Sequence, residues 1–232
     1  VTFNNSASNY ILSASIGGAG TPVLKLGTGS VTLSGNNTYS GGTTLSAGTL
    51  SVGAYANLPT AGGLTFNGGT LLVSGTGIKN LDAYTVNWDT FNGGLNVGAA
   101  GNTLTVTNAI GGSGGLSKLG AGTLGLSGAN GYGGGTTVGA GIVRLDHSGA
   151  LGSGTVNMVS GGEVDLTGNL TVTNAITVRG VGASSSGEGS LRSINGTSNA
   201  WSGPVTLGEN FARIGCTGGG ILAVSSVIGS GT

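Results

Sequence analysis

The feature that most limits how this chain can fold is a long internal repeat without a gap. Residues 25–52 recur at 118–145, so each residue of the first copy has a counterpart 93 positions later. Over residues 25–48 and 118–141 the copies read KLGTGSVTLSGNNTYSGGTTLSAG and KLGAGTLGLSGANGYGGGTTVGAG. Repeats of this kind are typical of proteins whose units stack on their neighbours. The chain is therefore expected to extend along an axis rather than to close around one compact core.

A weaker third copy and a recurring lead-in extend this pattern through the rest of the chain. The third copy covers residues 199–207 and has Trp201 where the first two have Tyr39 and Tyr132. The lead-in is an apolar and Ser/Thr-rich stretch that ends in Gly, and it stands at 12–20, 104–114 and 222–231. We therefore expect one continuous segment over residues 1–232, with repeats at about 12–104 and 105–221 and a new copy starting near 222. Both ends then resemble cuts through a continuing array.

The secondary structure expected inside each repeat is a series of short strands. Residues 103–107 place Leu104 and Val106 on one face and three threonines on the other, and 49–52 and 163–166 alternate in the same way. Gly, Asn and Ser separate these runs at places that suit tight turns. Coils of about 20 residues would divide the 93-residue repeat into four or five. The pattern predicts an all-β, right-handed parallel β-helix.

An antiparallel β-sandwich is the competing interpretation. Three Asn-Gly dipeptides, at 67–68, 92–93 and 195–196, are strong hairpin signals when alternating apolar residues flank them. The gap-free repeat favours the solenoid, because Gly and Asn also serve the corners of a β-coil.

Composition agrees with a thin core and excludes several functions. The 232 residues include 53 Gly, with only 6% charged and 5% aromatic residues and a net charge of zero. A chain with seven basic residues has no electrostatic footprint for nucleic acid or for anionic lipid. No apolar run approaches the roughly 20 residues of a membrane-spanning helix. The single Cys216 is expected to be a small buried apolar side chain.

The repeated string at 114–141, and the copy that starts at Lys25, resemble the autotransporter-associated β-strand repeat, also called the passenger-associated transport repeat. Gly131 and Gly133 in the second copy, and Pro204 and Val205 in the third, depart from the motif. The resemblance implies a bacterial surface or secreted protein with a β-helical passenger. It also implies a role in efficient export and in presenting adhesive or other modules away from the cell.

Two sets of repeated side chains could be mistaken for a functional site. Tyr39, Tyr132 and Trp201 occupy equivalent positions, either as an adhesive stripe or, as we favour, packed over the Gly-rich corners. Lys25 and Lys118 also recur, and the expectation is that their chains lie along the coil surface with the amines in water.

The few acidic residues and the one histidine give no strong site. Glu163 and Asp165 share one strand face and could hold Ca²⁺ or act as an acid–base pair, but an outward polar row is the preferred interpretation. His147 is expected in an exposed turn. Asp82 and Asp89 flank Tyr84 and Trp88, a combination found in sugar-binding grooves, although an ordinary loop with a packed aromatic is favoured.

The sequence as a whole predicts a structural protein with no catalytic, cofactor-binding or metal-binding residues. It would be a stalk, an extracellular fibre or an adhesin passenger at the bacterial surface. The expected partners are copies of the same array stacked end to end, with surface glycans or a host surface as further partners, and neither nucleic acid nor membrane insertion. The alternative is a polysaccharide-binding or polysaccharide-cleaving β-helix. Short threonine rows such as 103–107 leave an ice-binding module as a third possibility.

Overall fold

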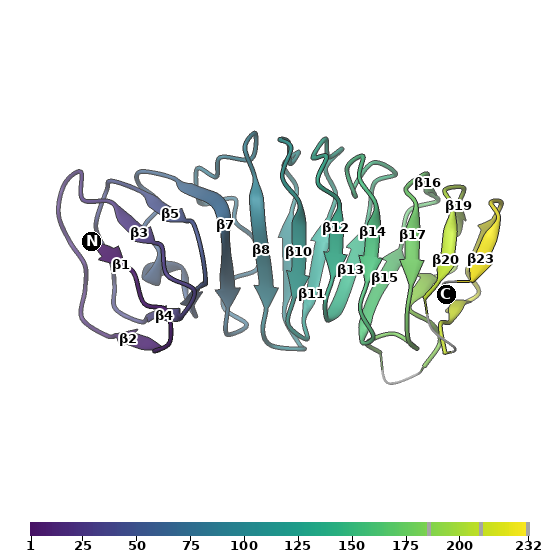
Figure 1. The fold of residues 1–232 in the computed structure, drawn as a ribbon, viewed down its shortest axis with the longest axis horizontal. Helices are drawn as coiled ribbons and strands as arrows, with labels where there is room; N and C mark the ends of the chain where they lie inside the picture. Colours follow the sequence, from purple (N-terminus) through teal and green to yellow (C-terminus); the bar gives the residue numbers. More distant parts are fainter. Residues whose placement is uncertain (185–186, 209–210, 231–232) are drawn as a thin grey trace.

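Parallel pairing between consecutive turns organises the computed structural model, which describes residues 1–184, 187–208 and 211–230. About 11 turns, roughly 21 residues apart, stack along one axis. Every strand pair in these ranges is parallel, from β1–β3 near the N-terminus to β20–β23 near the C-terminus. The turns form an elongated rod with the two chain ends at its opposite ends (Figure 1). The predicted parallel β-helix is confirmed, and the antiparallel sandwich is wrong.

The strands fall into rows in which each member belongs to the next turn. The first row is β1 (Thr2–Phe3), β3 (Val23–Lys25), β5 (Thr43–Leu45) and the start of β7 (Leu64–Val73). A second row contains β2 (Tyr10–Leu12), β4 (Ser30–Leu33) and β6 (Thr49–Val52) and joins the end of β7. It continues as β8 (Asn92–Val97), β10 (Leu116–Leu119), β12 (Thr136–Val138), β14 (Val156–Met158), β17 (Ile176–Val178), β20 (Val205–Leu207) and β23 (Ile228–Ser230).

Two further rows complete the rod. One is β9 (Thr103–Val106), β11 (Thr123–Leu126), β13 (Gly141–Leu145), β15 (Gly162–Leu166), β18 (Leu191–Ser193) and β21 (Ile214–Cys216). The other is β16 (Thr171–Val172), β19 (Ser198–Trp201) and β22 (Ile221–Val224). A single 3₁₀ turn, η1 (Tyr55–Asn57), is the helical element in the described ranges, and no helix there is long and apolar enough to span a membrane.

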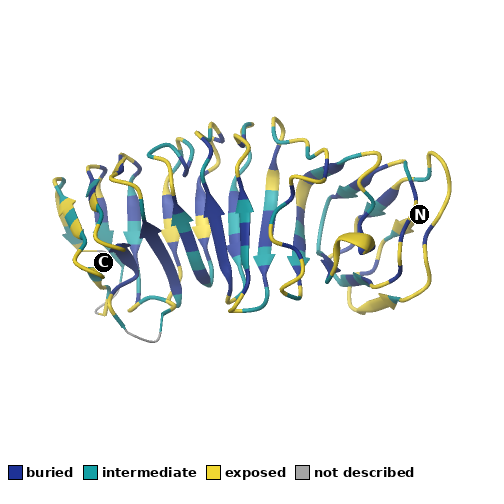
Figure 2. Cartoon of the chain, turned by 180° about the vertical axis from the view of Figure 1, so that it is seen from behind, coloured by how far each residue is buried: buried dark blue, intermediate teal, exposed yellow. Residues whose placement is uncertain are grey.

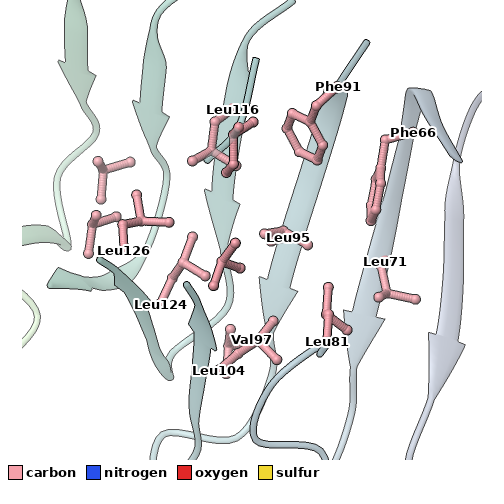
Figure 3. Packing of buried hydrophobic residues seen from close by; sticks show 14 of the residues in the cluster. Phe66, Leu71, Leu81, Phe91, Leu95, Val97, Leu104, Leu116, Leu124 and Leu126 are labelled. Carbon is pink, nitrogen blue, oxygen red and sulfur yellow. The ribbon is translucent and has the colours of Figure 1, made fainter. Parts of the chain in front are cut away.

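The core is a set of narrow apolar rows that run along the axis, because the pleat sends alternate residues of every strand inward. One such row is Leu104, Leu124, Val143, Val164 and Leu191, each paired with the next and each fully buried. Figure 3 shows leucines and phenylalanines from successive turns pointing into the same interior. Exposed residues gather at the loops and on the end strands, whereas the middle strands are mostly buried (Figure 2). Burial of these rows is the main driving force for stacking.

The two copies of the sequence repeat are not in phase along the rod. The ladder partners starting at Val31 are Leu50, then Leu71, Leu95 and Lys118. Lys118 therefore stacks four turns above Val31, although its sequence counterpart is Lys25. The 93-residue repeat thus contains slightly more than four turns, within the four or five that the sequence predicts.

The shift arises at β7, which runs around a corner of the coil. Its first residues pair with β5 and its last four with β6, with a register irregularity between Asn67 and Thr70. Gly68, with φ of 108°, lies inside this irregularity, where a left-handed backbone favours glycine. The second repeat copy therefore starts on the next face of the rod.

Candidate functional site

Lys25 and Lys118, at the same position of the two repeat copies, are fully buried. In β10, Leu116 points inward, and the residue two places later shares its face. Lys118 accordingly lies in an inner row between Leu95 and Val138. The expectation of surface lysines is wrong, because strand alternation outweighs the preference of a charged side chain for water.

The buried amine of Lys118 is held by backbone carbonyl groups. Its Nζ donates to the carbonyl oxygens of Leu119 at 2.9 Å, Gly120 at 2.7 Å and Ala140 at 3.0 Å. Ala140 belongs to the following turn, so the side chain joins two corners that lie one above the other. Three acceptors match the three donors of an ammonium group.

The first copy repeats this arrangement. Lys25 Nζ donates to the carbonyl oxygens of Gly27 and, at 3.3 Å, of Ala47, the counterparts of Gly120 and Ala140. A glycine with left-handed backbone follows each alanine, Gly48 with φ of 63° and Gly141 with φ of 65°. A Cβ at Gly48 would lie 2.7 Å from Lys25 Nζ, so the glycine leaves room for the amine.

Burial changes the acidity of both amines. Removal from water lowers the pKa of Lys118 to about 8 and also lowers the pKa of Lys25. No ion pair to either amine occurs in the described ranges, so carbonyl groups alone hold them.

A repeated asparagine joins three consecutive turns. Asn130 Oδ1 accepts from the backbone amide of Ile110 at 2.8 Å, and its Nδ2 donates to the carbonyl of Ala150 at 2.5 Å. Its counterpart Asn37 makes the equivalent bonds to Ile16 N at 2.8 Å and Asn57 O at 2.6 Å. The bonded groups lie about one turn before and one turn after each asparagine.

The bridging role of these asparagines was not among the sequence-based expectations, although the sequence contains a signal for it. The asparagine recurs at the same repeat position, and potential partners lie 20 or 21 residues away on either side. An amide carries both donors and acceptors, so it can satisfy backbone groups of two neighbouring coils at once.

The three repeated aromatic side chains, Tyr39, Tyr132 and Trp201, are fully buried. The hydroxyl of Tyr39 lies 2.7 Å from Thr43 Oγ1, and that of Tyr132 lies 2.6 Å from Thr136 Oγ1. Trp201 Nε1 donates to the carbonyl of Asn174 at 2.9 Å. Each ring fills the interior at a corner and satisfies its polar atom locally.

The weak third copy keeps the asparagine as well as the aromatic. Asn199 Oδ1 accepts from Leu170 N at 2.7 Å, and its Nδ2 donates to Ser193 Oγ at 2.8 Å. The bridge to the preceding turn therefore remains where most of the motif has been lost.

Glu163 and Asp165 point outward, opposite Val164, but they are buried and not exposed to solvent. Arg192, the ladder partner of Asp165, binds it through Nε to Oδ1 at 2.9 Å and Nη2 to Oδ2 at 3.0 Å. Its Nη2 also contacts Glu163 Oε1. The expectation of a solvated outward row is wrong, because Arg192 and a further segment cover this face. The sequence gives no sign of this cover.

The cover is a segment between β17 and β18. Glu163 Oε2 accepts from the backbone amides of Ala183 and Ser184, both at 2.9 Å. The step from Val164 to its partner Leu191 is 27 residues, compared with 21 for the preceding step, and this longer turn contains Ala183 and Ser184.

Electrostatics in this cluster are governed by burial. Burial raises the pKa of Glu163, and the bonds from Ser184 and the charge of Arg192 act in the opposite direction. Desolvation alone would lower the pKa of Arg192, but Asp165 outweighs it and the net direction is upward. Both carboxylates are engaged by the guanidinium, which makes the cluster a brace between turns.

The remaining candidate residues lie apart from one another. His147 is exposed in a turn as expected, and its Nδ1 accepts from Gly149 N at 2.9 Å. Cys216 is exposed, contrary to expectation, because it lies in the outermost strand of its row. No group of three potential metal ligands occurs in the described parts of the chain.

The acidic and aromatic residues of 82–89 form a separate surface feature. Asp82 and Asp89 are exposed, Tyr84 is buried and Trp88 is half-buried. Asp82, Tyr84 and Trp88 line one hollow, whereas Asp89 is not among its lining residues.

The segments that match a known protein family are those that contain the repeated buried side chains described above. The model of the passenger-associated-transport-repeat family matches residues 23–52 and 116–145, which contain the buried lysines, the bridging asparagines and the buried tyrosines. No curated protein and no solved structure matches the chain. The chain is therefore a β-solenoid that carries two passenger-associated transport repeats, which is consistent with an autotransporter passenger repeat protein.

Proposed function

We propose that this chain is a rigid stalk segment of a surface-exposed or secreted bacterial passenger, in which each turn is a template for the next. The observation that carries the proposal is the asparagine bridge. Asn37 and Asn130 each bind the turn before and the turn after, with matching geometry in both copies. A turn of this kind completes its hydrogen bonds only when both neighbours are in place.

Such coupling also suits export. A chain that emerges from an envelope in order would add one turn at a time, because each new strand pairs with the strand already formed. Burial of the inner rows outside the cell would then oppose backward movement without any other energy source. We infer that the repeats at 23–52 and 116–145 aid their own export.

The test is the deletion of one whole turn, which preserves the stacking register. Removing residues 116–135 brings Thr136 onto Gly93, because both pair with Leu116. This deletion removes most of the second family repeat, including Lys118 and Asn130. The control removes residues 93–115, the preceding turn, and leaves both matched repeats intact. Both variants are exported in their native passenger context and quantified at the cell surface.

Loss of surface protein only in the 116–135 deletion is the expected result. Equal surface levels in the two deletions would show that the repeat has no special part in export, and that any effect reflects the length of the rod.

End-to-end stacking is the second part of the proposal. Tyr10 and Ile228 lie on inner rows, yet they are 53% and 50% exposed because each belongs to a terminal turn. Both terminal turns also have open strand edges, which favour pairing with another chain. A second copy of the rod presents the complementary apolar end.

Sedimentation at increasing concentration tests this stacking. Association is expected for the unaltered chain and is expected to weaken in Tyr10→Lys and Ile228→Lys. Val159→Lys is the matched control, because Val159 is 49% exposed but follows β14, which has a neighbouring turn on each side. A chain that remains monomeric at high concentration would contradict end-to-end stacking.

A further inference from the structure

The aromatic residues of this chain are concentrated at one place on the rod. The chain has four Phe, five Tyr and two Trp, and five of these eleven residues form two ring clusters. One cluster is Tyr55 with Tyr84, and the other is Phe66 with Trp88 and Phe91. Tyr84, Trp88 and Phe91 lie in the long segment between β7 and β8, whereas Tyr55 lies in η1 and Phe66 in β7.

Trp88 is the partly exposed member of the second cluster and packs against both phenylalanines. Its ring lies 6.4 Å from that of Phe66, nearly parallel at 13°, and 5.7 Å from that of Phe91. Both phenylalanines are fully buried, whereas Trp88 is only half-buried. The indole is therefore backed by two buried rings and remains partly accessible to a ligand.

The hollow beside Trp88 measures about 380 Å³, within the roughly 300–1,000 Å³ of small-molecule sites. Its other lining residues include Asp82, Tyr84, Thr107 and Asn108. The carboxylate of Asp82 receives one long contact, from Thr107 Oγ1 at 3.5 Å. In the described part of the chain, the side-chain amide of Asn108 has no hydrogen bond. These acceptors and donors remain available to a ligand.

Two stacked tyrosines link the lining of this hollow to that of a second one. The second hollow measures about 450 Å³ and is lined in part by Tyr55, Leu58 and Pro59. The rings of Tyr55 and Tyr84 are stacked at 6.2 Å and 26°, and the Tyr84 hydroxyl donates to the carbonyl of Tyr55 at 3.1 Å. Each hollow therefore contains one ring of the pair, and together they can receive an extended ligand.

We propose that these two hollows bind a neutral polysaccharide. An aromatic platform surrounded by a carboxylate, a hydroxyl and an amide offers an apolar face for a sugar ring and hydrogen-bond partners for its hydroxyl groups. Asp82 and the nearby Asp89 disfavour an acidic polymer. Lys79, the nearby cation, donates to Asn102 Oδ1 at 2.7 Å. This inference is independent of the role in export.

Affinity electrophoresis of the full chain through gels that contain dextran, laminarin, galactomannan or hydroxyethylcellulose tests the proposal, with alginate as the acidic comparison. At least one neutral polymer is expected to retard the chain, and alginate is not. Retardation is expected to fall about tenfold or more in Trp88→Ala and several-fold in Asp82→Asn and Asn108→Ala. Asp89→Asn is the matched control and is expected to retain full retardation.

Trp88→Ala could reduce binding by unfolding the chain, so three further variants serve as controls. Trp88→Phe keeps an aromatic ring at this position. Asp82→Asn and Asn108→Ala change exposed side chains that support no core packing. Fluorescence of Trp88 in a Trp201→Phe background gives a second readout, and a neutral polymer is expected to shift it. The proposal is overturned if no neutral polymer retards the chain, if alginate alone does so, or if Asp82→Asn and Asn108→Ala bind like Asp89→Asn.

Discussion

Asn130 accepts a hydrogen bond from the backbone amide of Ile110, 20 residues earlier, at 2.8 Å. Through its other amide atom it binds Ala150, 20 residues later. A single side chain thus connects three turns of the solenoid, and the same bridge recurs at Asn37. Cohesion along the rod therefore depends on individual polar side chains as well as on the apolar rows.

Asn130→Ala is expected to destabilise the rod by about 1–3 kcal/mol, because it leaves an amide and a carbonyl without their partner. The midpoint of urea unfolding measures the change. Asn157→Ala is the matched control, since Asn157 is exposed on the outer face of β14, and its effect is expected within about 0.5 kcal/mol of zero. Equal effects of the two substitutions would contradict the bridging role.

Because Lys25 and Lys118 are buried, the free energy of unfolding is expected to increase with pH. Burial lowers the pKa of Lys118 to about 8 and that of Lys25 below 10.5, so the unfolded chain binds more protons than the folded chain in this interval. The free energy of unfolding therefore rises from pH 8 towards pH 10. The pKa of Tyr132 is raised to about 12, so the tyrosines reverse the trend above pH 10.

Urea midpoints at pH 7.5 and 9.5 measure this rise in the unaltered chain. The double variant Lys25→Met, Lys118→Met is expected to lose the rise while keeping the apolar stems in place. Persistence of the same pH dependence in the double variant would show that other groups cause it.

Arg192→Met is expected to destabilise the chain by about 3–5 kcal/mol, because two buried carboxylates lose their counter-charge. The loss is expected to be smaller at pH 5 than at pH 7.5. Burial already raises the pKa of Glu163, and without the guanidinium the carboxyl takes up its proton more readily.

Glu188→Gln is the control for this substitution, since Glu188 is 44% exposed at the rim of the same cluster and its replacement is expected to cost little. Adding Glu163→Gln and Asp165→Asn to Arg192→Met is expected to recover part of the stability. No recovery would indicate that Arg192 acts through packing and not through charge.

The hydroxyl groups of Tyr132 and Thr136 are expected to show a measurable energetic coupling inside the second repeat. Their hydroxyl oxygens lie 2.6 Å apart in the interior, so Tyr132→Phe and Thr136→Val should each be destabilising. A double-mutant cycle is expected to give a coupling free energy of about 0.5–1.5 kcal/mol. Additive effects in unfolding experiments would show that the hydroxyl groups do not support each other.

The architecture was predictable from the sequence, because stacking makes the local pattern repeat. Alternation at 103–107 and 163–166 identified inward residues such as Leu104 and Val164, and the gap-free repeat favoured stacked coils over hairpins. The same alternation could have placed Lys118 inside, two residues after Leu116. The general preference of lysine for water led to the wrong expectation.

Contacts between distant parts of the chain were not predictable in the same way. Nothing near Glu163 and Asp165 indicates that Arg192, 27 residues after Asp165, would cover and neutralise them, because the longer turn that permits it has no repeat counterpart. The phase shift at β7 depends on one irregular corner, and the exposure of Cys216 depends on its outermost position.

Disulfide cross-linking between neighbouring turns tests the stacked arrangement most directly. Thr137 and Asn157 are exposed ladder partners 20 residues apart in sequence, and strands in adjacent turns lie about 4.8 Å apart, within reach of a disulfide. In a Cys216→Ser background, the pair Thr137→Cys, Asn157→Cys is expected to form a disulfide under mild oxidation. The pair Thr137→Cys, Thr177→Cys, two turns apart, is expected to remain reduced. Equal cross-linking of the two pairs, or none in the first, would contradict parallel stacking of successive turns.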